Sequence, residues 1–246
     1  MMERFRRTFF GVVLSLLGLA VSVQASEPVD LLLVLSADVS RSVDAEKFKL
    51  QREGYAAAFS DRRVIQAMTS GRLGQTAVVF VEWAGYGEQN VVVDWTLIKD
   101  VESARRFGDA LLEMPRSFAG RTSISTGIDF AMEQLARAPY QAERRIIDVS
   151  GDGTHNSGRD VRASRDEAVA KGVTINGVVI LTETPLPRFP EHTHPEGGLE
   201  NYYRQNVIGG EGAFVIAATS FQTFGRAIIS KLITEVSALP ATSASR

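Results

Sequence analysis

Short apolar runs alternate with longer segments of helical period along most of the chain. The runs have few polar interruptions, which is typical of strands that are buried on both faces of a sheet. Their alternation with amphipathic segments predicts an α/β fold with a mostly parallel sheet and helices on both faces. The predicted strands are residues 29–36, 77–83, 91–95, 145–149, 173–180 and 213–217.

The second and third predicted strands are joined by the short segment Gly85-Tyr86-Gly87. A parallel pair needs a crossover of a dozen or more residues, so these two strands should form an antiparallel hairpin. The predicted fold is therefore a doubly wound, mostly parallel six-stranded sheet with one antiparallel edge strand.

Small oxygen-bearing side chains follow several of these strands. Asp38, Ser40 and Ser42 alternate directly after the apolar run 31–35, Thr122 precedes a helical pattern, and Asp152 follows the run 146–149. Carboxylates and hydroxyls suit a hard cation such as Mg²⁺ or Mn²⁺ rather than Zn²⁺. Because the carboxyl ends of parallel strands meet at one edge, we expect these five residues to converge on a metal site.

Each residue also has a plainer interpretation as a helix cap. Ser42 or Asp44 could begin the helix that follows, and Thr122 or Ser123 could begin a helix over 124–136. Three unrelated caps have no reason to match one coordination set, so we favour the metal site.

The pattern Asp-x-Ser-x-Ser, then a Thr, then an Asp followed by Gly resembles the metal-ion-dependent adhesion site of von Willebrand factor type A (VWA) domains. The resemblance covers about residues 29–237 and implies the strand order three, two, one, four, five, six. It also implies that Ser40, Ser42 and Thr122 contact the metal through hydroxyls, and Asp38 and Asp152 directly or through water. Arg121 departs from the pattern, since the family usually has Gly there. The chain is most similar to a secreted bacterial group called domain of unknown function 1194.

The resemblance implies an incomplete coordination shell that an Asp or Glu of a protein partner completes. Neutral hydroxyl ligands leave the charge of the dication poorly compensated, so it attracts such a carboxylate. We therefore predict a divalent-cation-dependent binding module and not an enzyme. The alternative is a Mg²⁺-dependent hydrolase of phosphate esters that uses His155. The sequence has neither the phosphate-binding G-x-x-x-x-G-K-[ST] loop nor a G-x-S-x-G elbow.

Residues of the neighbouring loops should form the rim that contacts the partner. The long segment 182–212 should carry specificity without contributing metal ligands. His192 and His194 could instead form a transition-metal pair, but we favour a solvated Pro-rich loop. His155 could shuttle protons, although a local hydrogen bond is favoured, and Trp83 could be a packing residue. The predicted rim consists of Trp83, Arg121, His155, Asn156, His192 and His194.

The N-terminal residues resemble an export signal. Arg4, Arg6 and Arg7 precede the apolar stretch 9–23, which ends at Val23-Gln24-Ala25. We predict a signal peptide at 1–25, one VWA domain at 26–239 and a disordered tail at 240–246. The protein would then be periplasmic or secreted. An uncleaved anchor is disfavoured, because the apolar stretch is shorter than the roughly 20 residues that span a bilayer.

Composition narrows the possible partners and sites. The chain has 246 residues and no cysteine, which excludes disulfides, thiolate metal sites and cysteine nucleophiles. Its formal net charge is −2, and loss of the arginine-bearing leader would make it more acidic. Nucleic acid is therefore not an expected partner.

Overall fold

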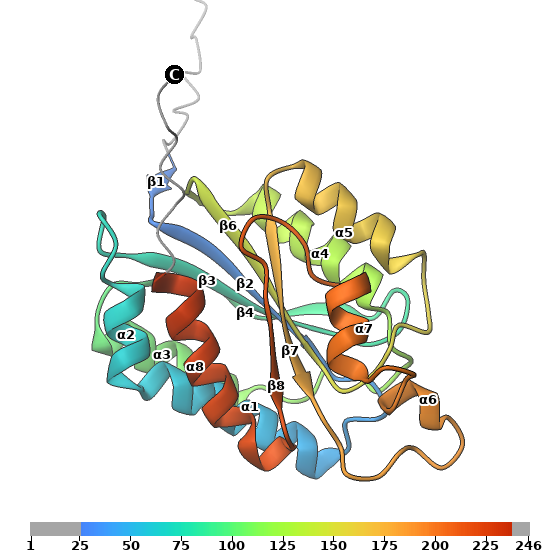
Figure 1. The fold of residues 1–246 in the computed structure, drawn as a ribbon. Coiled ribbons are helices and arrows are strands. Elements are labelled where there is room, and N and C mark those ends of the chain that lie inside the picture. Colours follow the sequence, from blue (N-terminus) through green and yellow to red (C-terminus); the bar gives the residue numbers. More distant parts are fainter. Residues whose placement is uncertain (1–25, 238–246) are drawn as a thin grey trace, which may run out of the picture.

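A six-stranded sheet runs through the centre of the protein in the computed structural model, which describes residues 26–237 (Figure 1). The strand order is β4-β3-β2-β6-β7-β8, and all pairs are parallel except β3 with β4. This confirms the predicted fold class, the antiparallel edge strand and the order that the VWA resemblance implied. The strands are β2 (Leu31–Asp38), β3 (Thr76–Trp83), β4 (Gln89–Ile98), β6 (Arg144–Gly151), β7 (Thr174–Ile180) and β8 (Val215–Ala218).

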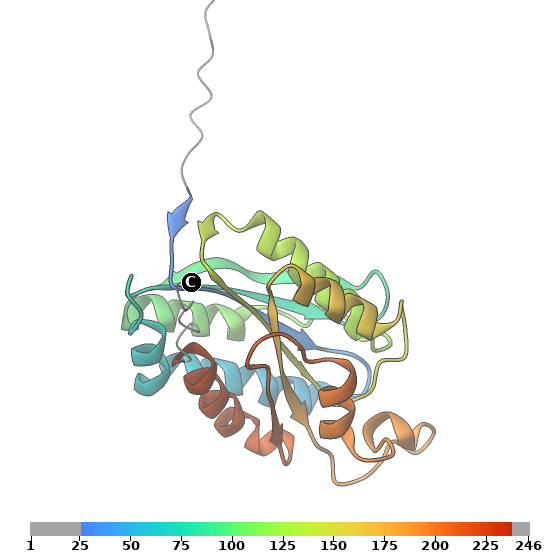
Figure 2. The ribbon, with the colours of Figure 1, turned by 45° about the horizontal axis from the view of Figure 1, so that its top comes forward.

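Helices cover both faces of this sheet (Figures 1 and 2). One layer contains α1 (Ala45–Ser60), α2 (Arg62–Met68), α3 (Val101–Glu113) and α8 (Phe224–Ser237). The other contains α4 (Ile124–Arg137), α5 (Val161–Ala170) and α7 (Leu199–Asn206). The short α6 (Pro190–Thr193) and the 3₁₀ turn η1 (Phe221–Thr223) lie in the connections on either side of β8.

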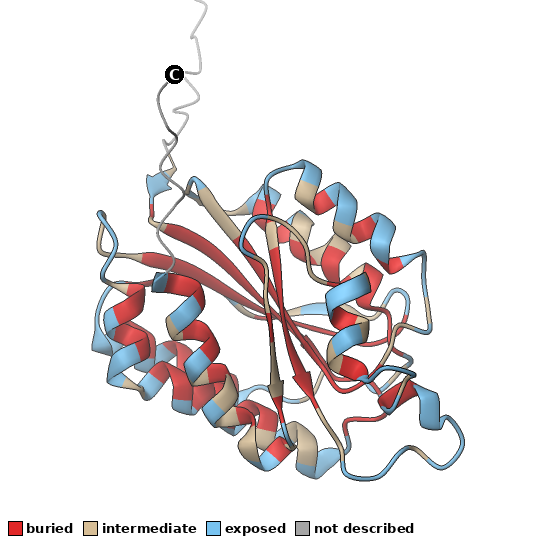
Figure 3. Cartoon of the chain, in the orientation of Figure 1, coloured by how far each residue is buried: buried red, intermediate tan, exposed pale blue. Residues whose placement is uncertain are grey.

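The central strand β2 shows why the apolar runs lack alternation. Leu31, Leu33 and Leu35 pack in the cluster with α1, α2, α3 and α8, whereas Leu32 and Val34 pack in the cluster on the opposite face. Successive side chains of a strand point to opposite faces, so burial of both faces requires apolar residues at every position. Figure 3 shows the strands buried and the outer sides of the helices exposed.

Two details differ from the sequence prediction. The central strand extends to Asp38, so this residue is the last of β2 rather than part of the loop. A two-stranded parallel sheet of β1 (Glu27–Pro28) and β5 (Tyr140–Gln141) was not predicted, because two-residue strands have no periodicity to detect.

The predicted signal peptide and C-terminal tail lie outside the described residues. Within residues 26–237, none of the helices has the length and apolar character needed to cross a membrane.

Candidate metal centre

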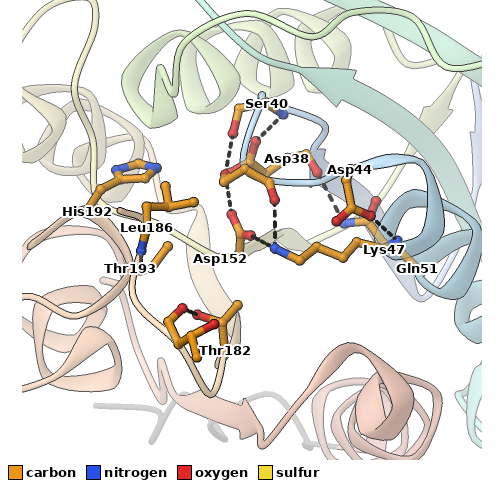
Figure 4. A network of polar contacts seen from close by, with 12 residues as sticks. Asp38, Ser40, Asp44, Lys47, Gln51, Asp152, Thr182, Leu186, His192 and Thr193 are labelled. Carbon is orange, nitrogen blue, oxygen red and sulfur yellow. Dashed lines mark hydrogen bonds and ion pairs between the residues drawn. The ribbon is translucent and has the colours of Figure 1, made fainter. Parts of the chain in front are cut away.

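The five predicted metal donors come together at the carboxyl ends of β2 and β6, and Figure 4 shows three of them, Asp38, Ser40 and Asp152, near one another. Thr122 Oγ1 donates to Ser40 Oγ at 3.0 Å, and Ser40 Oγ lies 3.2 Å from Ser42 Oγ. Ser42 Oγ donates to Asp152 Oδ1 at 2.5 Å, and the Ser40 backbone N–H donates to Asp38 Oδ1 at 2.7 Å. Three loops that are distant in the sequence therefore present their oxygens to one another.

Helix capping does not explain these hydroxyls. Asp44 is the N-cap of α1 and accepts the Lys47 backbone N–H at 2.9 Å, so Ser42 is not needed there. Ser123 occupies the N-cap position of α4, and its side chain makes no capping hydrogen bond. Thr122 directs its hydroxyl to Ser40 instead. The plainer interpretation is therefore wrong for Ser42 and Thr122, whose hydroxyls serve the cluster.

The two carboxylates of the cluster are completely buried. Asp38 Oδ2 and Asp152 Oδ2 have no hydrogen-bond partner among the described residues. Burial, and then the charge of Asp152, raise the pKa of Asp38 to about 8, and burial also raises the pKa of Asp152. A buried carboxylate oxygen without a partner is costly, and a bound cation would supply the missing compensation.

The spacing of the hydroxyls fits a small octahedral cation. Mg²⁺ binds oxygens at about 2.0–2.1 Å, so adjacent donors in an octahedron lie about 3 Å apart. The Thr122–Ser40 and Ser40–Ser42 oxygen distances are 3.0 and 3.2 Å. Neutral hydroxyls make up three of the five donors in this set. The described residues contain no group of three or more His, Cys, Asp or Glu side chains that could hold a metal. Ser40, Ser42 and Thr122, with Asp38 and Asp152, are the residues that could hold a divalent cation here.

Two basic side chains support the cluster and were not found from the sequence. Lys47 Nζ donates to the Ser42 carbonyl at 2.7 Å and lies 3.6 Å from Asp152 Oδ2. Arg116 donates to the carbonyls of Val39 and Ser40 at 2.6 and 2.8 Å. Lys47 lies in the first turn of α1, directly after the donor loop, and this position in the sequence could have indicated its proximity to the donors. Arg116 lies in an irregular segment that has no pattern to place it.

The segment 182–212 takes a larger part in the site than the sequence predicted. The His192 side chain is buried, with Nε2 3.3 Å from Thr122 Oγ1 and Nδ1 3.3 Å from Thr154 Oγ1. The solvated-loop prediction is wrong for His192, because α6 turns the ring onto Gly153. A Cβ at Gly153 would lie only 2.2 Å from His192 Nε2. Burial lowers the pKa of His192. His194 is exposed, and its ring Nδ1 lies 3.0 Å from Thr193 Oγ1 rather than near the donor cluster.

Tyr203 of α7 also reaches this region from the same segment. Its side chain is fully buried, and its hydroxyl has no hydrogen-bond partner among the described residues. A Cβ at Gly151 would lie 2.5 Å from the Tyr203 hydroxyl and 3.1 Å from Asp38 Oδ2. Gly151 therefore allows the tyrosine to pack closely behind Asp38.

The predicted rim residues divide into two groups. Arg121 and Asn156 are exposed next to the cluster. An Arg121 guanidinium N–H donates to the Asn156 backbone carbonyl at 2.7 Å. The Thr122 backbone N–H donates to Asn156 Oδ1 at 3.0 Å. Trp83 is completely buried against Gly127 of α4, so its assignment to the rim is wrong and the packing alternative holds.

His155 lies slightly away from the donors. It is partly buried, and its backbone N–H donates to the Tyr202 hydroxyl at 3.1 Å. Burial lowers the pKa of its side chain. The ring Nδ1 is buried without a hydrogen-bond partner among the described residues, so the local hydrogen bond that the sequence favoured for this side chain is not formed at Nδ1.

A family model described as protein of unknown function (DUF1194) matches residues 28–240. No curated protein matches the sequence. The fold is similar to that of proximal thread matrix protein 1 from the mussel byssus, with a TM-score of 0.61 and 15% identity over 86% of this chain and 49% of that one. Another structure of that mussel protein has zinc in its metal-ion-dependent adhesion site (MIDAS) motif. Its fold matches with a TM-score of 0.57 and 18% identity over 86% of this chain and 48% of that one.

Two bacterial structures show the same fold. The pilus adhesin SpaC from Lactobacillus rhamnosus GG has a TM-score of 0.60 and 13% identity over 87% of this chain and 30% of that one. A von Willebrand factor type A protein from Catenulispora acidiphila has a TM-score of 0.54 and 15% identity over 85% of this chain and 42% of that one. The chain therefore spans half or less of each of these relatives.

Proposed function

The chain belongs to the DUF1194 family and has a VWA fold, and on this premise we propose that it is a divalent-cation-dependent module that captures a carboxylate of a protein partner. The observation that carries the proposal is the convergence of three hydroxyls with two buried carboxylates whose Oδ2 atoms accept no hydrogen bond from another described residue. Such a set suits a hard dication and leaves it attractive to an external carboxylate.

The chain's own residues divide this task. Ser40, Ser42 and Thr122 supply neutral oxygens, and a bound dication supplies an electrophilic centre. Asp38 and Asp152 compensate the cation from the buried side of the site. The zinc in the MIDAS motif of the mussel protein supports a divalent cation, and the oxygen-rich donors here favour Mg²⁺ or Mn²⁺.

We favour binding over hydrolysis of a phosphate ester. The residue that would act as a base in the hydrolase alternative is His155, whose backbone N–H donates to the Tyr202 hydroxyl and whose ring forms no hydrogen bond with any of the five described donor residues. The buried His192 instead lies against the donors. A periplasmic or secreted location is part of the proposal, supported by the predicted signal peptide and by similarity to a pilus adhesin and a byssus protein. The expected partner is a protein with an accessible Asp or Glu, and not a nucleic acid.

The metal site is tested by thermal unfolding with and without Mg²⁺ or Mn²⁺. A ligand that binds only the folded protein at 100 times its Kd stabilises it by about 2.7 kcal/mol. Asp38→Ala should remove this increment while the metal-free protein stays folded, because the change removes a buried carboxyl oxygen that has no hydrogen-bond partner among the described residues. The control Asp109→Ala changes an exposed carboxylate of α3 and should retain the full increment. An unchanged increment in Asp38→Ala would remove Asp38 from the site.

Carboxylate capture is tested with a short synthetic peptide that contains one Asp, compared with the same peptide containing Asn. The Asp peptide should bind in Mg²⁺ and not in chelator. Thr122→Val keeps the side-chain shape but removes the donor oxygen, so binding should fall at least about tenfold. Thr234→Val, on the exposed side of α8, should bind normally. Full binding in chelator, or equal binding of the Asn peptide, would contradict the proposed function.

A further inference from the structure

A pocket of about 890 Å³ opens directly beside the candidate metal centre. Ser42 and Thr122, two of the proposed metal donors, line its inner wall, and His192 lines it beside them. The 182–212 segment provides the opposite wall through Leu186, Pro187, Arg188 and Phe189. A ligand that reaches the metal therefore also lies against this pocket.

Positive charge dominates the pocket. Arg41, Arg121 and Arg188 line it, and Glu191 is the one acidic residue among its described lining residues. All three arginines are exposed, and none forms an ion pair with another described residue. Arginine stays charged at every physiological pH and presents a planar set of donors that matches a carboxylate. The pocket therefore holds donors that are still available to an anion.

His192 adds a donor at the boundary between the pocket and the metal donors. Asn156 Oδ1 accepts the Thr122 backbone N–H at 3.0 Å, so the amide NH₂ of Asn156 faces His192 Nδ1 at 3.5 Å. An NH₂ group can only donate, which makes Nδ1 the acceptor and places the proton of the neutral ring on Nε2. Nε2 lies 3.3 Å from Thr122 Oγ1, so its N–H is directed toward the metal donors. In this tautomer His192 is a hydrogen-bond donor rather than a metal ligand.

We propose that this pocket is a second carboxylate-binding subsite, so that the partner presents two neighbouring acidic residues. One carboxylate completes the metal shell beside the His192 N–H, and the other binds among Arg41, Arg121 and Arg188. This rests on the proposed function and names its partner class as an acidic peptide segment. Phe189, which is 62% exposed, and Leu186 give the wall an apolar surface that suits a peptide better than a sulfated polysaccharide.

The test compares labelled synthetic peptides that contain one Asp with peptides that contain Asp and Glu separated by zero, one or two residues. Affinity is measured by fluorescence anisotropy in Mg²⁺ at low and high salt. An exposed charge pair contributes up to about fivefold in affinity, so several arginines should favour the best two-acid peptide by about tenfold. This advantage should shrink at high salt, which screens exposed charges.

Variants separate the pocket from the metal centre. In the double variant Arg121→Gln, Arg188→Gln, which keeps only Arg41, the two-acid peptide should lose most of its advantage over the one-acid peptide. The thermal stabilisation by Mg²⁺ should persist, since neither residue is a metal donor. The control Arg72→Gln changes an exposed arginine in the loop before β3, at the opposite end of the sheet, and should retain the tenfold advantage.

The two proposals fail in different ways. Equal affinity of the one-acid and two-acid peptides would overturn the second subsite but leave the proposed function intact. Metal-independent binding of the one-acid peptide would instead overturn the proposed function. A heparin fragment that binds more tightly than every two-acid peptide would also overturn the subsite, because the arginines would then serve a sulfated polysaccharide.

Discussion

Two clusters of buried carboxylates lie close together along β6 and solve the same electrostatic problem differently. In the inner cluster, the fully buried Lys231 Nζ lies 2.8 Å from Asp148 Oδ1 and 2.8 Å from Glu235 Oε1. Asn176 of β7 also donates to Glu235, at 2.6 Å. This cluster carries its own cation within the core.

The outer cluster, at the strand ends, has no fully buried cation among residues 26–237. The side chain of Lys47 is 24% exposed, lies 3.6 Å from Asp152 Oδ2, and makes its hydrogen bond with a backbone carbonyl. The guanidinium of Arg116 is likewise bound to carbonyl groups. Within the described residues, Asp38 Oδ2 and Asp152 Oδ2 lack hydrogen-bond partners, as do both Asp148 side-chain oxygens and Glu235 Oε2 of the inner cluster. The two clusters therefore differ in the position of their cation: Lys231 is fully buried between the inner carboxylates, whereas Lys47 of the outer cluster is partly exposed and lies farther from Asp152.

The largest effect that would sharpen this comparison is expected for Lys231→Met. Removing one partner from a buried ion cluster leaves uncompensated charge and costs about 3–5 kcal/mol of unfolding free energy. Stability would be measured by urea denaturation. Lys49→Met removes an exposed helical pair with Glu53 and should change stability by less than about 0.5 kcal/mol. A Lys231 effect as small as that of Lys49 would mean that the inner cluster is not internally compensated as argued.

The pH dependence of stability should come partly from the same inner cluster. Burial raises the pKa of Asp148 to about 7. The positive charge of Lys231 opposes this rise, and the negative charge of Glu235 adds to it. The Tyr55 side chain of α1 also lies near enough to interact with this carboxyl group. Between about pH 4 and 7 the folded protein keeps a proton that the unfolded chain releases, so stability should fall as pH rises through this window. One proton corresponds to a slope of at most ~1.4 kcal/mol per pH unit.

The check is urea denaturation in chelator across this pH range for the wild type and for Asp148→Asn. The variant should show a shallower slope, while the part that comes from Asp38, whose pKa is also raised, should remain. Parallel slopes in the two proteins would show that Asp148 does not hold the extra proton.

The smallest expected effect concerns Lys47 in the outer cluster. Its ammonium lies close enough to Asp152 to repel an incoming dication, so Lys47→Met should strengthen Mg²⁺ binding about threefold or more. Lys47→Arg keeps the charge and should leave the affinity near that of the wild type. Calorimetric titration with Mg²⁺ measures both. Weaker binding in Lys47→Met would indicate that the lysine organises the Ser42 loop rather than competing with the cation.

The apolar pattern of the sequence determined the sheet and its antiparallel hairpin, because strands buried on both faces must be apolar at every position. The same pattern predicted that five oxygen-bearing residues lie at the edge where parallel strands end, whereas the strand order and the proposed metal role of these residues were implied by the resemblance to VWA domains. The tertiary structure decided which of several polar residues reach that edge. It buried Trp83 under α4, turned His192 onto Gly153 and placed Lys47 and Arg116 beside the donors. Apart from that of Lys47, which follows the donor loop directly, these placements depend on contacts between segments that are far apart in sequence, and no local period or propensity records such contacts.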